Sequence, residues 1–79
     1  MVSVSSSEYQ NMLKRLRRAR LDAGLTQVEV AERLGLRQTF VSKVELGERR
    51  LDPVELTLFA ALYSKPVTWF LELEEGEKD

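Results

Sequence analysis

The stretch that decides the fold is TQVEVAERLGLRQTFVSKVELG, residues 26–47. Thr26 followed by Glu29 is a capping-box pattern, which starts a helix, and Gly35 is typical of the position just after a helix end. The helix between them is so short that it is stable only when neighbouring elements hold it. Another helix, over about 37–46, follows directly. The stretch therefore predicts two short helices joined by a tight turn that contains glycine.

The helix over about 37–46 has two faces of different chemistry. At about 100° per residue, its apolar side chains gather on one face and point inward. They are Phe40, Val41 and Val44. The outward face carries amide, hydroxyl and ammonium groups, which can form hydrogen bonds with base edges. Its members are Gln38, Thr39, Ser42 and Lys43. Two short helices of which the second has such a polar face describe a helix-turn-helix motif.

Three further helices are predicted around this pair. Apolar residues recur at helical spacing throughout the chain, and the alternation typical of strands is missing. A first helix is predicted over about 8–23. A fourth begins after Asp52, which is a favoured N-cap residue, with Pro53 at the first helical position. A fifth is predicted over about 68–73. The fold class is therefore all-α, with five helices and the helix-turn-helix at helices two and three.

One charged side chain interrupts the apolar face of the first helix. Arg20 projects near the middle of that face, where an unpaired charge is costly. Glu45 falls at the border of the inward face of the third helix. Because each side chain lacks another compensating charge, we predict an Arg20–Glu45 ion pair between the first and third helices.

The composition allows one small domain and excludes several classes of protein. The chain has 79 residues, of which 43% are hydrophobic, enough for a packed core. It contains no Cys and no His, and so lacks the main zinc ligands, thiol nucleophiles and disulfides. Neither a signal peptide nor a long apolar segment is present. We therefore expect a cytoplasmic protein without catalytic residues, metal, cofactor or membrane contact, and not an enzyme.

The charges divide the chain into regions of opposite sign. Residues 1–50 hold ten basic and six acidic side chains, a balance of +4. Residues 51–79 hold two basic and seven acidic side chains, a balance of −5, and the whole chain has a charge of −1. Such a division suggests two surfaces with different partners. We expect a flexible N-terminus at 1–7, one helical domain at 8–73 and an acidic tail at 74–79.

Residues 13–71 resemble the lambda-repressor-like, Cro/C1-type (XRE) helix-turn-helix domain. The positions that carry the resemblance are Leu16, Arg17, Arg20, Leu25, Thr26, Gln27, Ala31, Gly35, Val41, Ser42, Val44, Glu45 and Gly47. The resemblance implies close packing of the two short helices at Ala31, a turn at Gly35 and a structural ion pair between Arg20 and Glu45. It also implies a regulator of transcription that binds double-stranded DNA. Small regulators of phages, plasmids and restriction–modification operons share this size and layout.

The resemblance places the third helix in the major groove, with its N-terminal residues deepest. The candidates for reading bases are Arg37, Gln38, Thr39, Ser42 and Lys43. The candidates for binding phosphates are Arg17, Gln27, Arg49 and Arg50. For each of these, an ordinary solvated side chain is the alternative; for Gln27, the alternative is support of the helix start.

The fourth and fifth helices depart from the family pattern. Leu58 and Leu62 stand where the family usually carries polar residues, and the family's glycine after the fourth helix is missing. The extra apolar side chains suggest a covered surface. The candidates for a dimer interface are Leu58, Leu62, Trp69, Phe70 and Leu73. A homodimer would place its recognition helices about 34 Å apart on a palindromic operator. Closure of the monomer core is the other explanation.

Two functions follow from these observations. The first is a sequence-specific, dimeric transcription regulator. The alternative is a protein-interaction module, such as an antitoxin, that holds a possible protein partner with the apolar surface of the fourth and fifth helices. The chain is expected to be either a complete minimal regulator or a fragment of a longer one.

Overall fold

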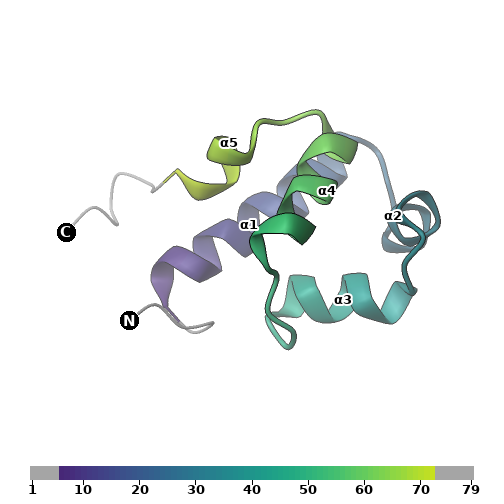
Figure 1. The fold of residues 1–79 in the computed structure, drawn as a ribbon, viewed down its shortest axis with the longest axis horizontal. Helices are drawn as coiled ribbons and strands as arrows, with labels where there is room; N and C mark the ends of the chain where they lie inside the picture. Colours follow the sequence, from purple (N-terminus) through teal and green to yellow (C-terminus); the bar gives the residue numbers. More distant parts are fainter. Residues whose placement is uncertain (1–5, 73–79) are drawn as a thin grey trace.

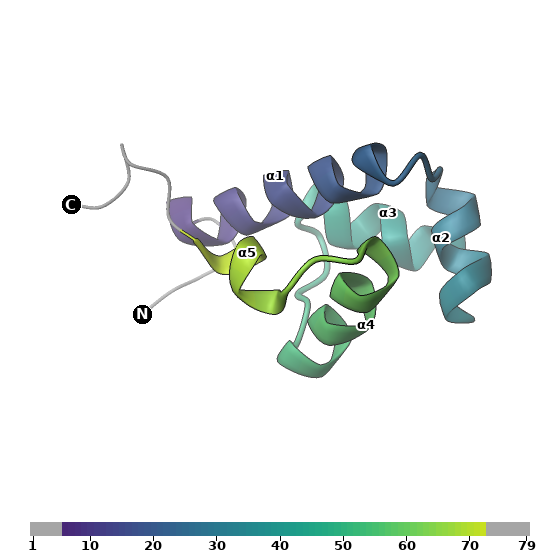
Figure 2. The same cartoon turned by 90° about the horizontal axis from the view of Figure 1, so that it is seen from above.

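The part of the chain that the structure describes forms five helices, and the first supports most of the others. They are α1 (Ser7–Asp22), α2 (Gln27–Leu34), α3 (Gln38–Leu46), α4 (Pro53–Tyr63) and α5 (Val67–Leu71). Helix α1 contacts α3, α4 and α5, while α2 packs on α3 and α4. Figure 1 shows α3 along the lower edge of the domain, and Figure 2 shows α5 beside the first half of α1. The predicted all-α architecture is confirmed, and each helix begins and ends within two residues of its predicted position.

The structure, a computed structural model, describes residues 6–72. The predicted acidic tail at 74–79 and most of the predicted flexible N-terminus at 1–7 lie outside this range. Helix α1 begins at Ser7, one residue before its predicted start. Within the described range, no helix combines the length and the apolar character needed to cross a membrane.

Local side-chain caps define the start of α2 and α4. Thr26 accepts a hydrogen bond from the backbone N–H of Glu29 at 3.1 Å, and the Glu29 carboxylate accepts one from the backbone N–H of Thr26 at 2.9 Å. Asp52 and Glu55 form the same reciprocal pair at 2.7 and 3.1 Å. Both capping interactions satisfy N–H groups that have no partner inside the helix. The predicted starts of these two helices are confirmed.

The core contains side chains from all five helices. The most deeply buried apolar ones are Leu16, Val30, Val41, Val44, Phe59 and Phe70. A polar contact closes its edge, where the Tyr9 hydroxyl accepts a hydrogen bond from the backbone N–H of Leu51 at 2.9 Å. This contact fastens the segment before α4 to α1, so the position of α4 depends on α1.

Two polar side chains of α1 anchor the C-terminal part of the described chain. Asn11 is buried and donates its Nδ2 to the carbonyl oxygen of Glu72 at 2.7 Å. Arg15 donates its Nη1 to the carbonyl oxygen of Trp69 at 2.9 Å, and its guanidinium lies 5.2 Å from the centre of the Trp69 ring. The carbonyl groups at the end of α5 therefore receive donors from α1.

The packing of α5 corrects the predicted dimer interface. Phe70 is fully buried within the monomer core, so its assignment to a surface between two copies is wrong. Trp69 packs edge-on against the Phe70 ring, with the ring centres 5.0 Å apart. Trp69 and Leu62 are partly buried against the core, while Leu58 is exposed. Leu73 lies outside the described residues. The second explanation, closure of the monomer core, therefore holds for Phe70.

Ser64 occupies a strained position after α4. It has φ +58°, and it is the one residue other than glycine with a positive φ among residues 6–72. A side chain in this left-handed region costs about 1–2 kcal/mol because its Cβ crowds the following carbonyl. This is the place where the family's glycine is missing, and the structure shows that the chain keeps the left-handed turn without it.

We predict that Ser64→Gly stabilises the protein. Glycine adopts a positive φ without steric cost, so the free energy of unfolding should rise by about 0.5–1 kcal/mol, or a few degrees in Tm. Thermal unfolding followed by circular dichroism measures this change. As a matched control, Ala61→Gly in the exposed interior of α4 should lower stability by about 1 kcal/mol. An unchanged or lower Tm for Ser64→Gly would show that the turn is not strained.

Candidate functional site

The exposed face of α3 is predominantly polar. Gln38, Thr39 and Lys43 are exposed and Ser42 is half-buried, whereas Val41 and Val44 on the opposite face have no exposed surface. Arg37, the N-cap residue of α3, is also exposed. All five predicted base-reading residues therefore belong to one short helix and its N-cap.

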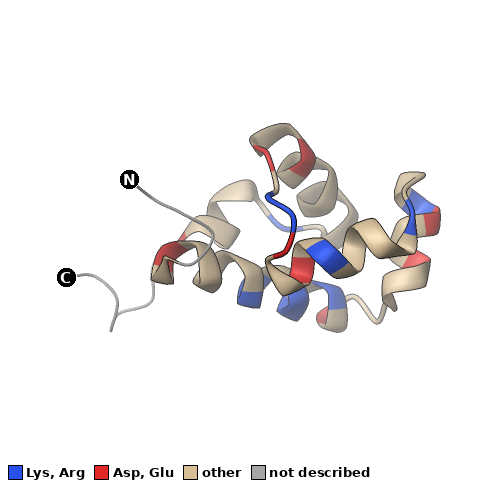
Figure 3. Cartoon of the chain, turned by 90° about the horizontal axis from the view of Figure 1, so that it is seen from below, with Lys and Arg blue, Asp and Glu red and all other residues tan. Residues whose placement is uncertain are grey.

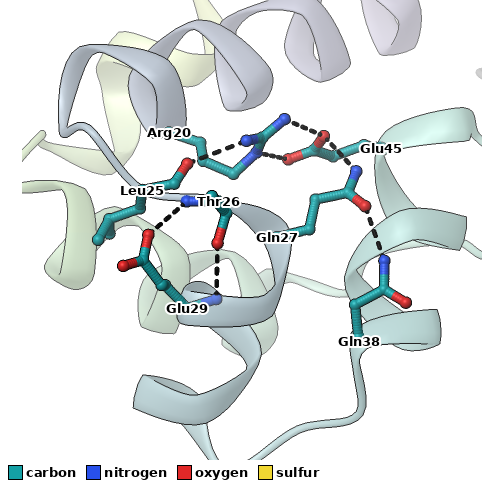
Figure 4. Close-up of polar contacts among 7 residues, drawn as sticks. All are labelled: Arg20, Leu25, Thr26, Gln27, Glu29, Gln38 and Glu45. Carbon is teal, nitrogen blue, oxygen red and sulfur yellow. Dashed lines mark hydrogen bonds and ion pairs between the residues drawn. The ribbon is translucent and has the colours of Figure 1, made fainter.

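A chain of hydrogen bonds leads from the core to this face (Figure 4). Arg20 of α1 donates its Nε to Glu45 Oε2 at 2.7 Å and its Nη2 to Glu45 Oε1 at 3.1 Å. Its Nη1 donates to the carbonyl oxygen of Leu25 at 3.0 Å. Gln27 donates its Nε2 to Glu45 Oε1 at 3.0 Å, and Gln38 donates its Nε2 to Gln27 Oε1 at 2.9 Å. The structure thus contains the ion pair that the projection of Arg20 and Glu45 predicts.

The ion pair is shielded from solvent. The side chain of Arg20 is 9% exposed to solvent, and that of Glu45 is 5% exposed. The hydrogen bond to Glu45 raises the pKa of Arg20 above its usual value, against the lowering effect of burial. Because both charges are nearly removed from water, each is stable only while the other is present. The pair therefore ties α1 to α3 tightly.

The first turns of α2 and α3 meet at the Gln27–Gln38 hydrogen bond. The unpaired N–H groups at a helix start carry a partial positive charge. Gln27 is the first residue of α2, and Gln38 is the first residue of α3. The site therefore combines two electropositive helix starts with an exposed amide between them.

The predicted phosphate-binding residues differ in how many of their N–H groups already have a partner within the domain. Arg17 is exposed, and with Ser42 and Leu46 it lines an open hollow of about 440 Å³ beside Gln27. Arg50 is exposed, and its guanidinium lies 5.4 Å from the centre of the Tyr9 ring. These two guanidinium groups have no ion-pair partner in the part of the chain that the structure describes.

Arg49 has a structural role that sequence reasoning did not find. Its Nη1 and Nη2 donate to the two carboxylate oxygens of Glu55 at 2.8 and 3.0 Å. This hydrogen bond holds the pKa of Glu55 below its usual value. The guanidinium also lies 4.2 Å from the centre of the Phe40 ring. Its Nη1 also donates to the carbonyl oxygen of Arg50 at 2.7 Å, so only Nε and one N–H of Nη2 remain without these partners. Arg49 thus connects the loop after α3 to the start of α4.

Two surface features flank α3 on opposite sides (Figure 3). On one side, α1 carries Lys14, Arg17 and Arg18, all exposed and without an ion-pair partner among residues 6–72. On the other side lies α4, which carries two exposed apolar side chains, Val54 at 71% and Leu58 at 47%. The helices on the two sides of α3 thus differ, since α1 carries exposed basic side chains and α4 carries exposed apolar ones.

Leu46 is a member of the exposed α3 face that sequence reasoning missed. It is exposed and follows Ser42 by one helical turn, which was the signal that could have identified it. Residues 6–72 contain no group of three or more His, Cys, Asp or Glu side chains that could hold a metal ion. The site is a polar helix face with basic residues beside it.

The chain is similar to known proteins in sequence and in fold. A family model described as Helix-turn-helix matches residues 16–70. An XRE-family like protein from Pseudomonas syringae pv. tomato str. DC3000 has a similar solved structure, with a TM-score of 0.76 and 45% sequence identity. The match covers 82% of this chain and 81% of that chain. No curated protein matches this sequence.

We predict that Glu45→Ala strongly destabilises the domain. The substitution leaves the Arg20 charge nearly buried and without its partner, so the free energy of unfolding should fall by about 3 kcal/mol. Chemical denaturation measures this loss. The control is Glu32→Ala on the exposed surface of α2, which should change stability by less than about 0.5 kcal/mol. Equal stability of the two variants would contradict a structural role for the ion pair.

Proposed function

The chain belongs to the Cro/C1-type (XRE) helix-turn-helix family of DNA-binding transcription regulators, and we propose that it recognises a specific duplex sequence with α3 in the major groove. The observation that carries this proposal is the single polar face of α3, exposed beside unpaired cations. The major groove admits an α-helix and displays a distinct pattern of donors and acceptors for each base pair. A helix with amide, hydroxyl and ammonium groups on its outer face suits that pattern.

The proposed base contacts follow from the donors and acceptors of each side chain. Gln38 can pair its amide with adenine, and Lys43 can donate to guanine O6 or N7. The Thr39 methyl group can contact a thymine methyl group. Ser42 can reach a base or a phosphate, and Arg37 at the mouth of the helix can bind guanine or a phosphate. In this family of folds, residues at the start of the recognition helix lie deepest in the groove.

Phosphate contacts would fix the position of α3 on the duplex. Gln27 donates one N–H of its amide to Glu45, which leaves its second N–H for a phosphate beside the start of α2. Arg17 and Arg50 have no ion-pair partner among the described residues, so they are the stronger cationic candidates. Arg49 contributes mainly by holding the loop to Glu55, and its remaining N–H groups can still donate.

We predict that mutations distinguish residues that contact bases from residues that contact phosphates. Selection from a randomised duplex library should enrich one sequence that stays bound near physiological salt. Lys43→Ala should reduce discrimination at one base pair by about 1–3 kcal/mol, whereas Arg17→Ala should weaken binding to all sequences and reduce the salt slope by about 1. Fluorescence anisotropy over a salt series measures both effects.

The control for this experiment is Lys65→Ala, which removes a cation between α4 and α5 and away from α3. Its affinity and salt slope should match those of the unchanged protein. Weak binding without enrichment of any sequence, lost as salt rises, would refute sequence-specific recognition by α3.

A homodimer is the second part of the proposal. Val54 and Leu58 lie one helical turn apart on an uncharged face of α4 and are 71% and 47% exposed. Helix α4 lies on the side of α3 away from α1 (Figure 3). Pairing of this face about a two-fold axis would cover the apolar side chains and leave both α3 helices open. Two recognition helices related in this way require a palindromic operator with half-sites about 34 Å apart.

We predict that Leu58→Glu produces a monomer. Two like charges facing each other across a two-fold axis oppose association, so sedimentation equilibrium should show dimer for the unchanged chain and monomer for the variant. Leu21→Glu, an exposed leucine on α1, is the matched control and should remain dimeric. A strict monomer at high micromolar concentration would contradict the dimer. It would favour the alternative function, a protein-interaction module such as an antitoxin that uses the same face for another protein.

A further inference from the structure

A second hollow lies on the side of α1 that faces α5. Figure 1 shows α3 below α1 and α5 above it. The hollow has a volume of about 460 Å³ and is lined by Lys14, Arg15, Arg18, Asp22 and Trp69. Arg17 lines the hollow beside Ser42 instead, because side chains two positions apart on a helix project to nearly opposite sides. Lys14 and Arg18 form the ridge of α1 between these two sides.

The positive charges on the ridge have little compensation within the domain. Lys14 and Arg18 are exposed, stand one helical turn apart and form no ion pair among residues 6–72. Asp22 follows Arg18 by one further turn, and it too forms no ion pair with the described cations. Like charges at this spacing destabilise a helix. An anion bound between these side chains would remove that repulsion.

Arg15 is held in a fixed position in the same hollow. Its Nη1 donates to the carbonyl oxygen of Trp69 at 2.9 Å, and its guanidinium lies 5.2 Å from the centre of the Trp69 ring. The ion-pair partner of Arg15 is Glu72 at 3.6 Å, whose side chain is 61% exposed, so this pair contributes little. The Nε of Arg15 is buried without an acceptor in the described part of the chain. Its guanidinium is therefore preorganised, and its charge is only weakly compensated.

A further cation lies against the same tryptophan ring. The Nζ of Lys65, between α4 and α5, lies 4.6 Å from the centre of the Trp69 ring. Trp69 thus brings a cation from each side of the hollow close to its ring. Against these charges the hollow presents the carboxylate of Asp22. The excess of positive charge favours a ligand with at least two negative charges.

We propose that this hollow binds a small molecule that carries two or more phosphate groups, with Lys14, Arg15 and Arg18 as its ligands. Phosphate oxygens accept strong hydrogen bonds from guanidinium and ammonium groups alike. The hollow is larger than a diphosphate, which leaves room beside Trp69 for the rest of a phosphorylated molecule. The inference goes beyond the proposed function, because the binding requires neither α3 nor a duplex. A ligand at this place would join α1 to α5.

The test uses inorganic pyrophosphate as the probe and Trp69 as the reporter. Trp69 is the single tryptophan of the chain, so intrinsic fluorescence comes selectively from the hollow. Titration at constant ionic strength should give a saturable change with a dissociation constant of about 1 mM or below. Isothermal titration calorimetry should give one bound pyrophosphate per chain. Sulfate at the same ionic strength should bind at least about tenfold more weakly, because it spans fewer of the cations.

A matched pair of variants tests the location of the site. Arg18→Ala should weaken pyrophosphate binding by about tenfold, because it removes a charge-assisted hydrogen bond. The control is Arg33→Ala, another exposed arginine on a helix, in the last turn of α2. Its affinity should change by less than about twofold, because salt screens distant charges. Alanine is the best helix former, so both variants should fold, as circular dichroism can show.

A duplex oligonucleotide distinguishes a free phosphorylated molecule from the phosphates of DNA. Pyrophosphate should remain bound when the duplex is added, because the hollow and α3 lie on different sides of α1. Displacement by the duplex would assign these cations to the DNA backbone and overturn the inference, while the proposed function would stand. The inference also fails if neither fluorescence nor calorimetry detects binding, if sulfate binds equally well, or if Arg18→Ala and Arg33→Ala have equal affinities.

Discussion

The carboxylate of Glu45 is the group on which the arrangement of this domain depends, because donors from two other helices meet on it. Arg20 reaches it from α1 and Gln27 from α2, while Glu45 itself belongs to α3. Helices as short as α2 and α3 are not stable alone, so their relative positions come from tertiary contacts. Apolar packing brings the three helices together but tolerates small rotations. A buried ion pair does not, since a shift that separates the charges leaves each of them without compensation.

This constraint explains how a small core can hold the exposed face of α3 in a defined position. Val41 and Val44 fix how deeply α3 sits, and Glu45 fixes its rotation relative to α1. The outer side chains of the same helix make few contacts within the domain and can therefore vary without loss of the fold. The proposed base contacts and the packing that stabilises the domain thus belong to opposite faces of one helix. Gln38 links the two faces, because its amide is exposed and also donates a hydrogen bond to Gln27.

The sequence predicted the helices and the ion pair because their signals are local or periodic. Capping residues mark the starts of α2 and α4, and the projection of α1 left Arg20 as a costly charge with one complementary partner. Phe70 was misplaced because a helix of five residues has too few turns for periodicity to define a buried face. The Gln27–Gln38 bond and the Arg49–Glu55 pair could not be predicted, since both depend on how separate segments approach one another.

The net charge of −1 is compatible with a surface that attracts DNA, because distance and salt limit which charges act together. At physiological ionic strength, electrostatic interactions decay over about 8 Å, whereas the domain extends over 38 × 23 × 19 Å. The potential at α3 is therefore governed by nearby groups, among them Arg17, Arg37 and Lys43. The carboxylates of Asp52 and Glu55 lie at the start of α4, and Glu55 is already neutralised by Arg49. Local arrangement, and not the sum over the chain, decides which face meets a polyanion.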